Sequence, residues 1–249
     1  MNISEMLGEY ERDYALAMLG VEDFPYQKLS GKTIVVDGES EYMKLTVCMS
    51  LLALNDKEKL SIKVLMLGNG NELSEKLAER NDFSLCSYEQ AAATEYNFFI
   101  STGICGLELN GTSAEYCRIT NNFARAISTA KSCLERCILL SDYRVYGELE
   151  SGLVISENEA GFVPFSNNGD MSQTTAVSIE TYFSAYAKQF NLPTIILRSG
   201  ILLGAKAELP KNFTDELFSA VAEGKQISLP NTCLLYTSPS PRDVEEARM

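Results

Sequence analysis

Short apolar runs alternate with longer amphipathic stretches along most of the chain. The apolar runs cover 33–36, 62–67, 83–86, 97–100, 137–140 and 194–197. The stretches with apolar positions at helical spacing cover 42–55, 72–80, 113–133, 174–190 and 212–223. Short buried strands that alternate with helices are typical of parallel sheets. We therefore predict an α/β fold, a doubly wound parallel sheet with helices on both faces.

The two ends of the chain depart from this pattern. Apolar residues recur at helical spacing over 5–20, which predicts a leading helix. Residues 233–243, Cys-Leu-Leu-Tyr-Thr-Ser-Pro-Ser-Pro-Arg-Asp, match the in-frame translation of a sequencing-library adapter, although a disordered Ser/Pro tail is the alternative. We predict a helical extension over 1–28, an α/β domain over 29–232 and an artefactual tail over 233–249, and we expect that the natural chain is longer.

The charge balance narrows the possible partners. The chain has 21 Lys and Arg against 34 Asp and Glu, a net charge of −13. An acidic surface repels phosphate backbones, so we expect no nucleic-acid partner. The sequence has neither a run of eighteen apolar residues nor a basic start with an apolar signal core. We therefore expect no membrane span and no secretory signal, and we predict a cytoplasmic protein.

Histidine is absent, which limits the available chemistry. Ser-His-Asp and Cys-His nucleophile systems are excluded, as are His-ligated metals, so acid–base chemistry must use Tyr, Lys, Asp, Glu or Cys. The seven cysteines show no paired spacing, and the three residues between Cys133 and Cys137 are not the usual gap of a zinc knuckle. We expect free thiols in a reducing compartment and no metal.

Four segments, each at a predicted strand, together carry a family likeness. They are Leu29–Gly38, Met66–Asn69, Leu139–Glu148 with its Val-Tyr-Gly run, and Ile195–Gly204. Their order along about residues 25–230 resembles the NAD-dependent epimerase/dehydratase family, the extended short-chain dehydrogenases. The resemblance implies a Rossmann-like fold, NAD or NADP as cofactor and a nucleotide sugar as substrate. It also implies a C-terminal substrate lobe that this chain contains only in part.

The glycine-rich loop of the family is altered in this chain. Its pattern, G-x-x-G-x-x-G, allows a tight turn, close approach of the backbone to a pyrophosphate, and close helix packing. Gly38 keeps the first place, whereas Glu41 and Lys44 take the second and third. Glu41, with Glu39 beside it, brings carboxylates to the expected pyrophosphate position, where like charges repel. Lys44 offsets this only in part, so we predict a loop that no longer holds a dinucleotide.

The resemblance also assigns a residue after the second strand to cofactor binding. The family often has an acidic residue there for the adenosine ribose, and this chain has Asn69 in a Gly-Asn-Gly turn. Asn69 can hydrogen-bond a hydroxyl, or it can serve only as a turn residue. Gly38, Glu41, Lys44 and Asn69 are therefore the candidate cofactor-binding positions.

The catalytic groups of the family, a Ser/Thr and a Tyr-x-x-x-Lys pair, are replaced. The Val-Tyr-Gly run puts Asp142 at the Ser/Thr position, with Ser141 one residue earlier. If Glu180 is aligned with the family's usual glutamate, Ser172 stands at the tyrosine position and Ala176 at the lysine position. A serine hydroxyl is too weak an acid to replace the phenol, and alanine supplies no group. Asp142 and Ser172 are thus candidate catalytic positions in degenerate form.

Other polar residues near the expected site have packing interpretations. Tyr182, Tyr186 and Lys188 lack the x3 spacing of a Tyr–Lys pair on one helix face, so we interpret them as packing and surface residues. Tyr146 is interpreted as a packing residue below the site.

Two further residues keep two interpretations each. Arg198, at the end of a predicted central strand, either binds the substrate nucleotide or forms a structural ion pair. Asn121 either matches an asparagine common in the family's central helix or is a surface residue.

Three hypotheses about function follow from the sequence, which leaves open whether the chain is an enzyme. We favour a catalytically inactive family member that binds a nucleotide sugar, forms a homodimer, or pairs with an active homologue through the helices 113–133 and 174–190. The alternative is an active nucleotide-sugar epimerase or dehydratase with atypical site residues. The third hypothesis is a different reaction that uses Asp142, Glu180 or Cys105.

Overall fold

The computed structural model describes residues 25–105, 107, 112–130, 133–147, 156–157, 171–200, 220 and 223–224. The predicted leading helix over 5–20, most of the predicted helix over 212–223 and the tail over 233–249 lie outside these residues. The proposed domain boundaries therefore stay predictions.

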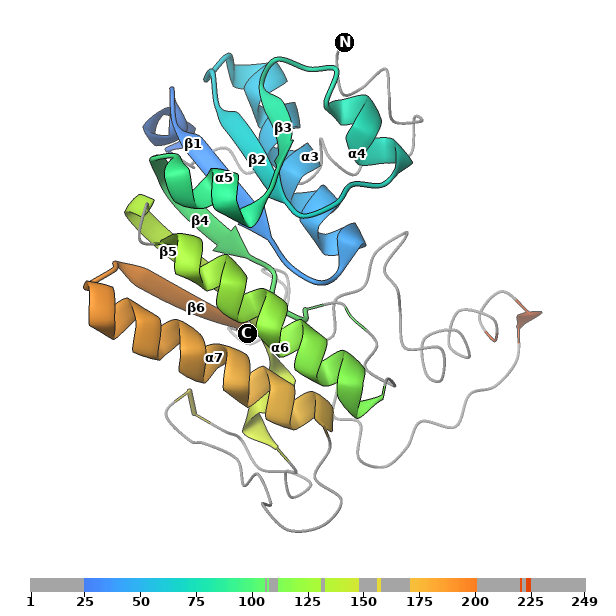
Figure 1. Cartoon of the computed structure of the whole chain (residues 1–249). Helices are drawn as coiled ribbons and strands as arrows, with labels where there is room; N and C mark the ends of the chain where they lie inside the picture. Colours follow the sequence, from blue (N-terminus) through green and yellow to red (C-terminus); the bar gives the residue numbers. More distant parts are fainter. Residues whose placement is uncertain are drawn as a thin grey trace, which may run out of the picture.

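Six parallel strands form one sheet in the order β3-β2-β1-β4-β5-β6 (Figure 1). The strands are β1 (Thr33–Asp37), β2 (Lys63–Leu67), β3 (Phe83–Cys86), β4 (Tyr96–Ser101), β5 (Cys133–Asp142) and β6 (Thr194–Ser199). The sequence order of strands reverses beside β1, between β1 and β4, and open parallel sheets bind ligands at such a switch point. The predicted doubly wound parallel sheet is confirmed.

Helices connect the strands and cover both faces of the sheet (Figure 1). They are the 3₁₀ helix η1 (Tyr26–Leu29), α3 (Glu41–Glu58), α4 (Glu72–Leu77), α5 (Tyr88–Ala93), α6 (Ser113–Thr129), the 3₁₀ helix η3 (Tyr143–Tyr146) and α7 (Met171–Phe190). α6 and α7 lie side by side on one face. α3 packs on the opposite face.

Alternating side chains of each central strand build two cores, one on each face. In β1, Ile34 and Val36 face α3, whereas Val35 faces α6. A strand that is buried on both faces needs consecutive apolar residues, which explains the Ile-Val-Val run. The α3 side of the core includes Cys48, Leu52, Val64 and Met66. The α6–α7 side includes Phe99, Ile119, Phe123, Leu139, Ile179 and Phe183.

Several elements differ from the predicted ones, most clearly β5. β5 begins at Cys133, not at residue 137, because it pairs with Tyr96 through an irregular register despite the charged pair Glu135-Arg136. α6 consequently ends at Thr129, before the predicted 133. α5, a helix of six residues, was not predicted.

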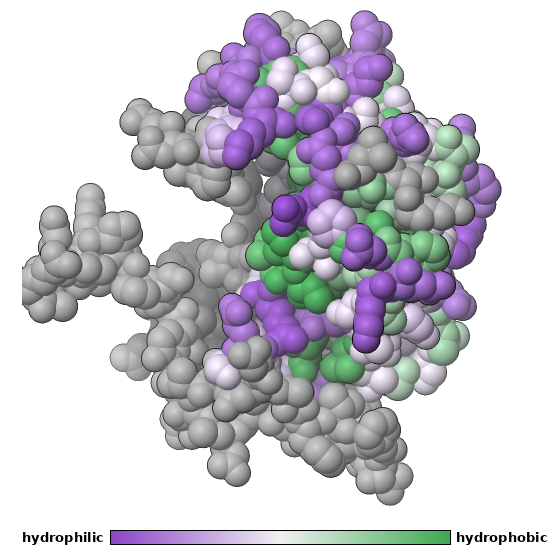
Figure 2. All heavy atoms as spheres, turned by 90° about the vertical axis from the view of Figure 1, so that its left-hand side faces the viewer, coloured by the Kyte–Doolittle hydropathy of each residue, from purple (hydrophilic) through white to green (hydrophobic). Residues whose placement is uncertain are grey.

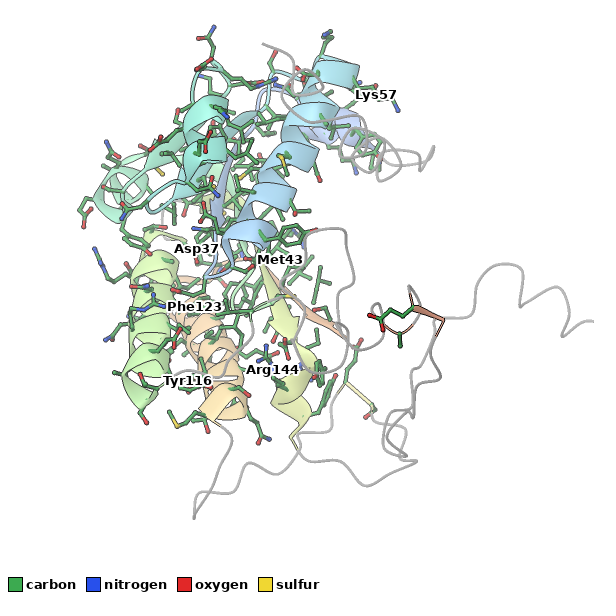
Figure 3. All side chains as sticks on the ribbon, turned by 90° about the vertical axis from the view of Figure 1, so that its right-hand side faces the viewer. Asp37, Met43, Lys57, Tyr116, Phe123 and Arg144 are labelled. Atoms are coloured by element: carbon green, nitrogen blue, oxygen red, sulfur yellow. The ribbon has the colours of Figure 1, made fainter. Side chains whose placement is uncertain are left out.

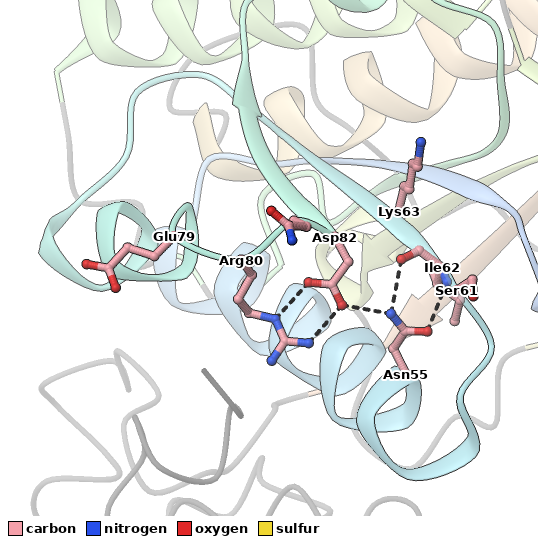
Figure 4. A pocket seen from close by; sticks show the side chains of 8 residues that line it. Asn55, Ser61, Ile62, Lys63, Glu79, Arg80 and Asp82 are labelled. Atoms are coloured by element: carbon pink, nitrogen blue, oxygen red, sulfur yellow. Dashed lines mark hydrogen bonds and ion pairs between the residues drawn. The ribbon is translucent and has the colours of Figure 1, made fainter.

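A polar network holds the end of α3 against the start of β2 and β3. Arg80 is buried and makes paired hydrogen bonds to Asp82 and to Asp56, with N–O distances from 2.7 to 3.0 Å. Asn55 donates to Asp82 at 2.7 Å and exchanges hydrogen bonds with the Ile62 backbone (Figure 4). A pocket of about 430 Å³ lies beside this network. Because the Arg80 guanidinium pairs with two aspartates, we interpret the network as a structural clamp that holds these segments together.

One side of the molecule carries both polar and apolar residues. Figure 2 shows hydrophilic residues at its top and right, with an apolar area near the middle. The exposed apolar residues include Ile195 and Leu197 of β6, the last strand of the described sheet. Within the described ranges, every helix is too short or too polar to span a bilayer.

Candidate functional site

A cleft of about 820 Å³ lies over the carboxyl ends of β1, β2 and β3. Figure 3 looks onto this rim of the sheet, with Asp37 and Met43 where β1 meets α3, and with Arg144 further along. The lining of the cleft includes Asp37, Gly38, Glu39, Lys44, Gly68, Asn69, Tyr88, Asn122 and Arg125. Three of the four candidate cofactor positions thus lie in one cleft, and the fourth, Glu41, contacts Lys44.

The turn after β1 requires glycine at position 38. The φ angle of Gly38 is +149°, and a Cβ atom there would lie 1.9 Å from Oγ1 of Thr102. Any side chain would therefore collide with the β4 end, and the backbone angle alone disfavours other residues. The first glycine of the family pattern keeps its structural role here.

An internal ion pair occupies the second and third glycine positions. Nζ of Lys44 lies 3.1 Å from Oε2 of Glu41 and donates to the Leu67 carbonyl oxygen at 3.4 Å. The Lys44 side chain is only 8% exposed, so the ammonium is held inside the loop. Oε1 of Glu41 is buried without a hydrogen-bond partner in the described part of the chain. Lys44 therefore neutralises Glu41 and is not a free cation for a phosphate.

Glu39 places a second carboxylate at the edge of the cleft. Its oxygens accept hydrogen bonds from Arg118 at 3.0 Å and from Asn122 at 2.8 Å, both on α6. These contacts fix the carboxylate between the loop and α6. Arg118 compensates the charge of Glu39 as Lys44 compensates that of Glu41.

Asp37, which the sequence analysis did not single out, is buried at the floor of the cleft. It is 6% exposed and accepts a hydrogen bond from Ser101 at 3.1 Å. Burial raises the pKa of Asp37 to about 6, although Lys44 and the Ser101 hydrogen bond act in the opposite direction. A carboxylate with a shifted pKa in a cleft is a typical feature of binding and catalytic sites.

Asn69 lies in the turn after β2, as the sequence indicated. It is exposed and lines the cleft, and the preceding Gly68 has a φ of +95°. The side chain is therefore accessible to a ligand hydroxyl. Its turn and ligand interpretations both agree with this position.

A tyrosine and a lysine, Tyr88 and Lys44, do line the same glycine-containing cleft. Catalysis by a Tyr–Lys pair requires that the lysine lower the tyrosine pKa. Here burial and the charges of Asp37 and Glu39 raise the pKa of Tyr88 to about 12. The cation that contacts its ring is Arg125, at 4.5 Å. This arrangement does not produce a proton-transferring phenolate.

Asp142, the candidate catalytic carboxylate, is held by an arginine. It is 5% exposed at the end of β5 and accepts hydrogen bonds from Nε and Nη2 of Arg144 at 2.7 Å. The backbone N–H of Arg144 donates to it at 2.9 Å. These three hydrogen bonds engage the carboxylate within the protein.

Arg198, the candidate substrate-binding residue, is also engaged within the protein. It makes a bidentate pair with Glu180 at 2.9 and 3.0 Å and lies 4.8 Å from the ring centre of Tyr146. The Glu180 carboxylate in turn accepts a hydrogen bond from Ser141. Of the two interpretations of Arg198, the geometry agrees with the structural ion pair. The hydrogen bonds of Glu180 to Arg198 and Ser141 join α7, β6 and β5.

The two positions assigned to the Tyr–Lys pair lie in the first turns of α7. Ser172 is 5% exposed and Ala176 is 2% exposed. Ala176 belongs to the core with Ile179 and Phe183. Side chains at these positions pack into the protein and present neither a phenol nor an ammonium to a ligand.

Cys105, a residue of the third functional hypothesis, is bound as a thiol. Its Sγ lies 2.9 Å from Oγ of Ser199, which donates its single proton to the Ser141 carbonyl oxygen at 3.1 Å. The thiol must therefore donate to Ser199. Burial raises the pKa of Cys105. A buried, protonated thiol is a poor nucleophile.

The remaining candidates lie away from the cleft. Tyr186 donates a hydrogen bond to the Ser128 carbonyl oxygen at 2.9 Å, as expected for a packing residue, and Lys188 is exposed. Asn121 is exposed on the outer side of α6, whereas its neighbour Asn122 lines the cleft. Among the residues described, no group of three or more acidic or sulfur ligands is placed to hold a metal.

The strand order, the two covered faces and the cleft at the switch point together define a Rossmann-like domain. No family model matches the sequence, and no curated protein matches it. Similarity appears among solved structures.

UDP-glucuronic acid 4-epimerase from Bacillus cereus, in complex with NAD, is 19% identical, with a TM-score of 0.56 over 79% of this chain and 65% of its own. WbmH of Bordetella bronchiseptica, in complex with NAD⁺, is 13% identical, with a TM-score of 0.53 over 78% of this chain and 63% of its own. The dTDP-glucose 4,6-dehydratase of Bacillus anthracis, in complex with NAD, is 14% identical, with a TM-score of 0.51 over 79% of this chain and 63% of its own.

These similarities confirm the fold that the resemblance implied. This chain shares its Rossmann-like fold with the UDP-glucuronic acid 4-epimerase and the dTDP-glucose 4,6-dehydratase. It spans slightly less than two thirds of the length of these structures, 63% to 65%.

Sequence reasoning missed Asp37, Tyr88, Asn122, Arg125 and Arg144. Asp37 and Tyr88 each stand at or directly after the carboxyl end of a strand, which is a usable signal in a parallel sheet. Asn122 and Arg125 lie on α6, and no local pattern shows which face of a helix reaches a cleft. Arg144 directly precedes the Val-Tyr-Gly run, and its pairing with Asp142 was not predicted.

Proposed function

We propose that this chain is a catalytically inactive member of the NAD-dependent epimerase/dehydratase family that serves in the cytoplasm as a binding protein for a nucleotide-type ligand or a partner chain. The fold and the preserved Gly38 turn support the relationship. Arginine-bound carboxylates and core side chains at the expected chemical positions support the loss of hydride transfer.

One observation carries this proposal: Ala176, at the position assigned to the catalytic lysine, is a core residue with 2% exposure. Epimerases of this kind need a lysine to hold the nicotinamide ribose and to lower the tyrosine pKa. A buried alanine does neither. The Glu41–Lys44 pair adds to this, because it fills the loop that would receive the pyrophosphate.

The test is a titration of the purified chain with NADH, followed by ligand fluorescence, beside a turnover assay with UDP-sugars. The Bacillus cereus epimerase, which binds NAD, serves as the positive control. We expect no saturable binding below about 1 mM NADH and no product. Saturable binding together with sugar turnover would establish the alternative, an active enzyme with atypical residues.

We propose α6 and α7 as the surface for a homodimer or for pairing with an active homologue. The outer face of α7 exposes Tyr182 (47%) and Phe190 (42%), and the described part of this helix has only two charged residues, Glu180 and Lys188. Apolar and uncharged residues are typical of association surfaces. Light scattering after size exclusion tests this, because Tyr182→Glu should shift a dimer toward the monomer, while Lys57→Glu, at an exposed position of α3 on the opposite face of the sheet, should not.

A further inference from the structure

A short turn with the sequence Gly-Asn-Gly-Asn, residues 68–71, joins the carboxyl end of β2 to the start of α4 (Figure 1). Asn69 is exposed in this turn, lines the cleft and is followed directly by Gly70. An asparagine before a glycine is prone to lose its side-chain amide, because glycine has no Cβ to shield its backbone nitrogen. In a folded protein this reaction depends on how firmly the turn is held.

We propose that Asn69 is a site of spontaneous deamidation in the folded chain, which converts an amide at the cleft into a carboxylate. The products are aspartate and isoaspartate at position 69. The inference goes beyond the proposed function and does not depend on it, because the reaction needs no ligand, partner chain or enzyme.

The reaction requires only water as a co-reactant. The backbone N–H of Gly70 loses its proton to hydroxide, and the nitrogen attacks Cγ of Asn69. The new N–C bond closes a cyclic imide, while the bond from Cγ to the side-chain nitrogen breaks and releases ammonia, which takes its third proton from water. Water then adds to one of the two imide carbonyls and opens the ring, which gives aspartate or isoaspartate. No electron is transferred, so neither an oxidant nor a reductant is needed.

Both reacting groups are free of hydrogen bonds in the part of the chain that the structure describes. There, neither Asn69 nor Gly70 makes a hydrogen bond through its backbone or its side chain. The residues on either side are anchored, because Gly68 donates to the last carbonyl oxygen of β3 at 3.1 Å and Oδ1 of Asn71 accepts from the Ser74 N–H at 3.0 Å. A backbone N–H that already donates resists deprotonation, whereas the Gly70 N–H is available.

Packing requires glycine at position 70, which keeps the unshielded nitrogen next to Asn69. A Cβ atom on Gly70 would lie 2.6 Å from Cδ1 of Leu85 and would collide with Oγ of Ser74. Ser74 is buried, and its Oγ accepts from the Asn71 N–H at 2.7 Å and donates to the Asn71 carbonyl oxygen at 2.9 Å. This hydroxyl therefore cannot move aside without loss of the cap of α4.

Deamidation would change the chemistry of the cleft. The Asn69 amide can donate and accept hydrogen bonds, whereas a carboxylate only accepts them. The change adds a negative charge to a chain whose net charge is −13. Isoaspartate also lengthens the main chain of the turn by a methylene group, which alters the geometry between the anchored residues Gly68 and Asn71.

Peptide mass spectrometry of the aged full chain tests the inference. Trypsin releases residues 64–76, in which fragmentation distinguishes Asn69 from Asn71. The other Asn-Gly pairs, at 110–111 and 168–169, lie outside the described residues and fall on other tryptic peptides. The chain would be incubated at mildly acid and mildly alkaline pH, both folded and in guanidinium chloride.

We expect Asn69 of the folded chain to convert at a rate within about tenfold of that in the denatured chain, while Asn71 stays intact. The rate should rise with pH, because the attacking nitrogen must lose its proton. Enzymatic methylation specific for isoaspartate should label the same peptide. A slower rate in the folded chain means that the turn restrains the pair, and it overturns the proposal. Conversion without the isoaspartate label overturns the imide route.

An Asn-Gly pair inside a helix separates the effect of the free turn from that of the dipeptide. Asn122→Gly creates such a pair at Asn121, which is exposed near the middle of α6. There the N–H of residue 122 donates to the carbonyl oxygen four residues earlier, so we expect Asn121 to convert more than about tenfold more slowly than Asn69. Circular dichroism first establishes that the variant keeps its helices, and equal rates would then overturn the structural argument. If the variant fails to fold, the comparison of Asn69 between the folded and the denatured parent chain decides.

Discussion

Asp37 couples the site to protein stability. Its pKa is about 6 in the folded chain against an ordinary value of 3.8. A raised carboxyl pKa stabilises the fold below about pH 4, and this contribution is lost as pH rises through about 6. Asp37→Asn should therefore raise the free energy of unfolding near pH 8 by up to about 2 kcal/mol, with little change near pH 4. Urea unfolding across this range measures the difference, and an unchanged pH slope would contradict the burial argument.

Gly38 is expected to tolerate no side chain. Gly38→Ala introduces a Cβ that meets Thr102 at 1.9 Å, so we expect a loss of about 3 kcal/mol in unfolding free energy. Gly31→Ala is the matched control, because Gly31 has a positive φ of +69° but no atom within 4 Å of the added Cβ. It should cost only about 1 kcal/mol. Similar losses in thermal or urea unfolding would mean that backbone strain, not the collision, decides.

At the scale of residues, the sequence predicted which positions lie at the cleft better than it predicted which side chains pair with one another. Gly38, Lys44 and Asn69 do line one cleft. The pairing of Lys44 with Glu41 and of Asp142 with Arg144 was not predicted, although both partners are close in sequence. Rotamers and burial decide which of several nearby charges meet, and a linear pattern does not contain them.

The clamp around Arg80 belongs to the scale of elements. Arg80→Ala leaves Asp56 and Asp82 facing each other without their cation, so we expect a loss of about 2 to 3 kcal/mol in unfolding free energy. Lys76→Ala breaks an exposed pair with Glu72 and should leave the free energy of unfolding nearly unchanged. Denaturant midpoints of the two variants test this contrast, and equal shifts would show that the clamp adds nothing beyond a surface pair.

Periodicity predicted the elements where burial is regular. The run Ile34-Val35-Val36 is buried on both faces and became β1, and the alternating apolar positions of 42–55 became α3. β5 was predicted too short because its first residues include Glu135, which pairs with Lys32 and Asn97 from neighbouring segments. Tertiary partners outside the window made these charged residues acceptable in a strand.

At the scale of the whole molecule, the parallel sheet brings distant residues to one rim. The cleft draws on β1, α3, the turn after β2, α5 and α6. Strand order was not predicted from the pattern, yet the alternation of strands and helices predicted a candidate site at the carboxyl ends, and the cleft lies there. The fold and the position of the cleft were therefore predictable, whereas the charge of the cleft depends on which helix faces meet there.

If the proposed function is correct, introducing a Tyr–Lys pair should not produce catalysis. Ser172→Tyr with Ala176→Lys would place a phenol and an ammonium at the spacing of the family pair, but position 176 is 2% exposed. Burying a lysine there should cost about 3 kcal/mol or more, and the Glu41–Lys44 pair would still fill the phosphate position. We expect a lower melting temperature and no NADH-dependent turnover of UDP-sugars. Thr174→Tyr with Ser178→Lys repeats the spacing on a more exposed part of α7 and should stay close to the parent stability. Turnover by the first variant would show that the loop admits a dinucleotide. It would also show that the absence of the Tyr–Lys pair alone prevents catalysis.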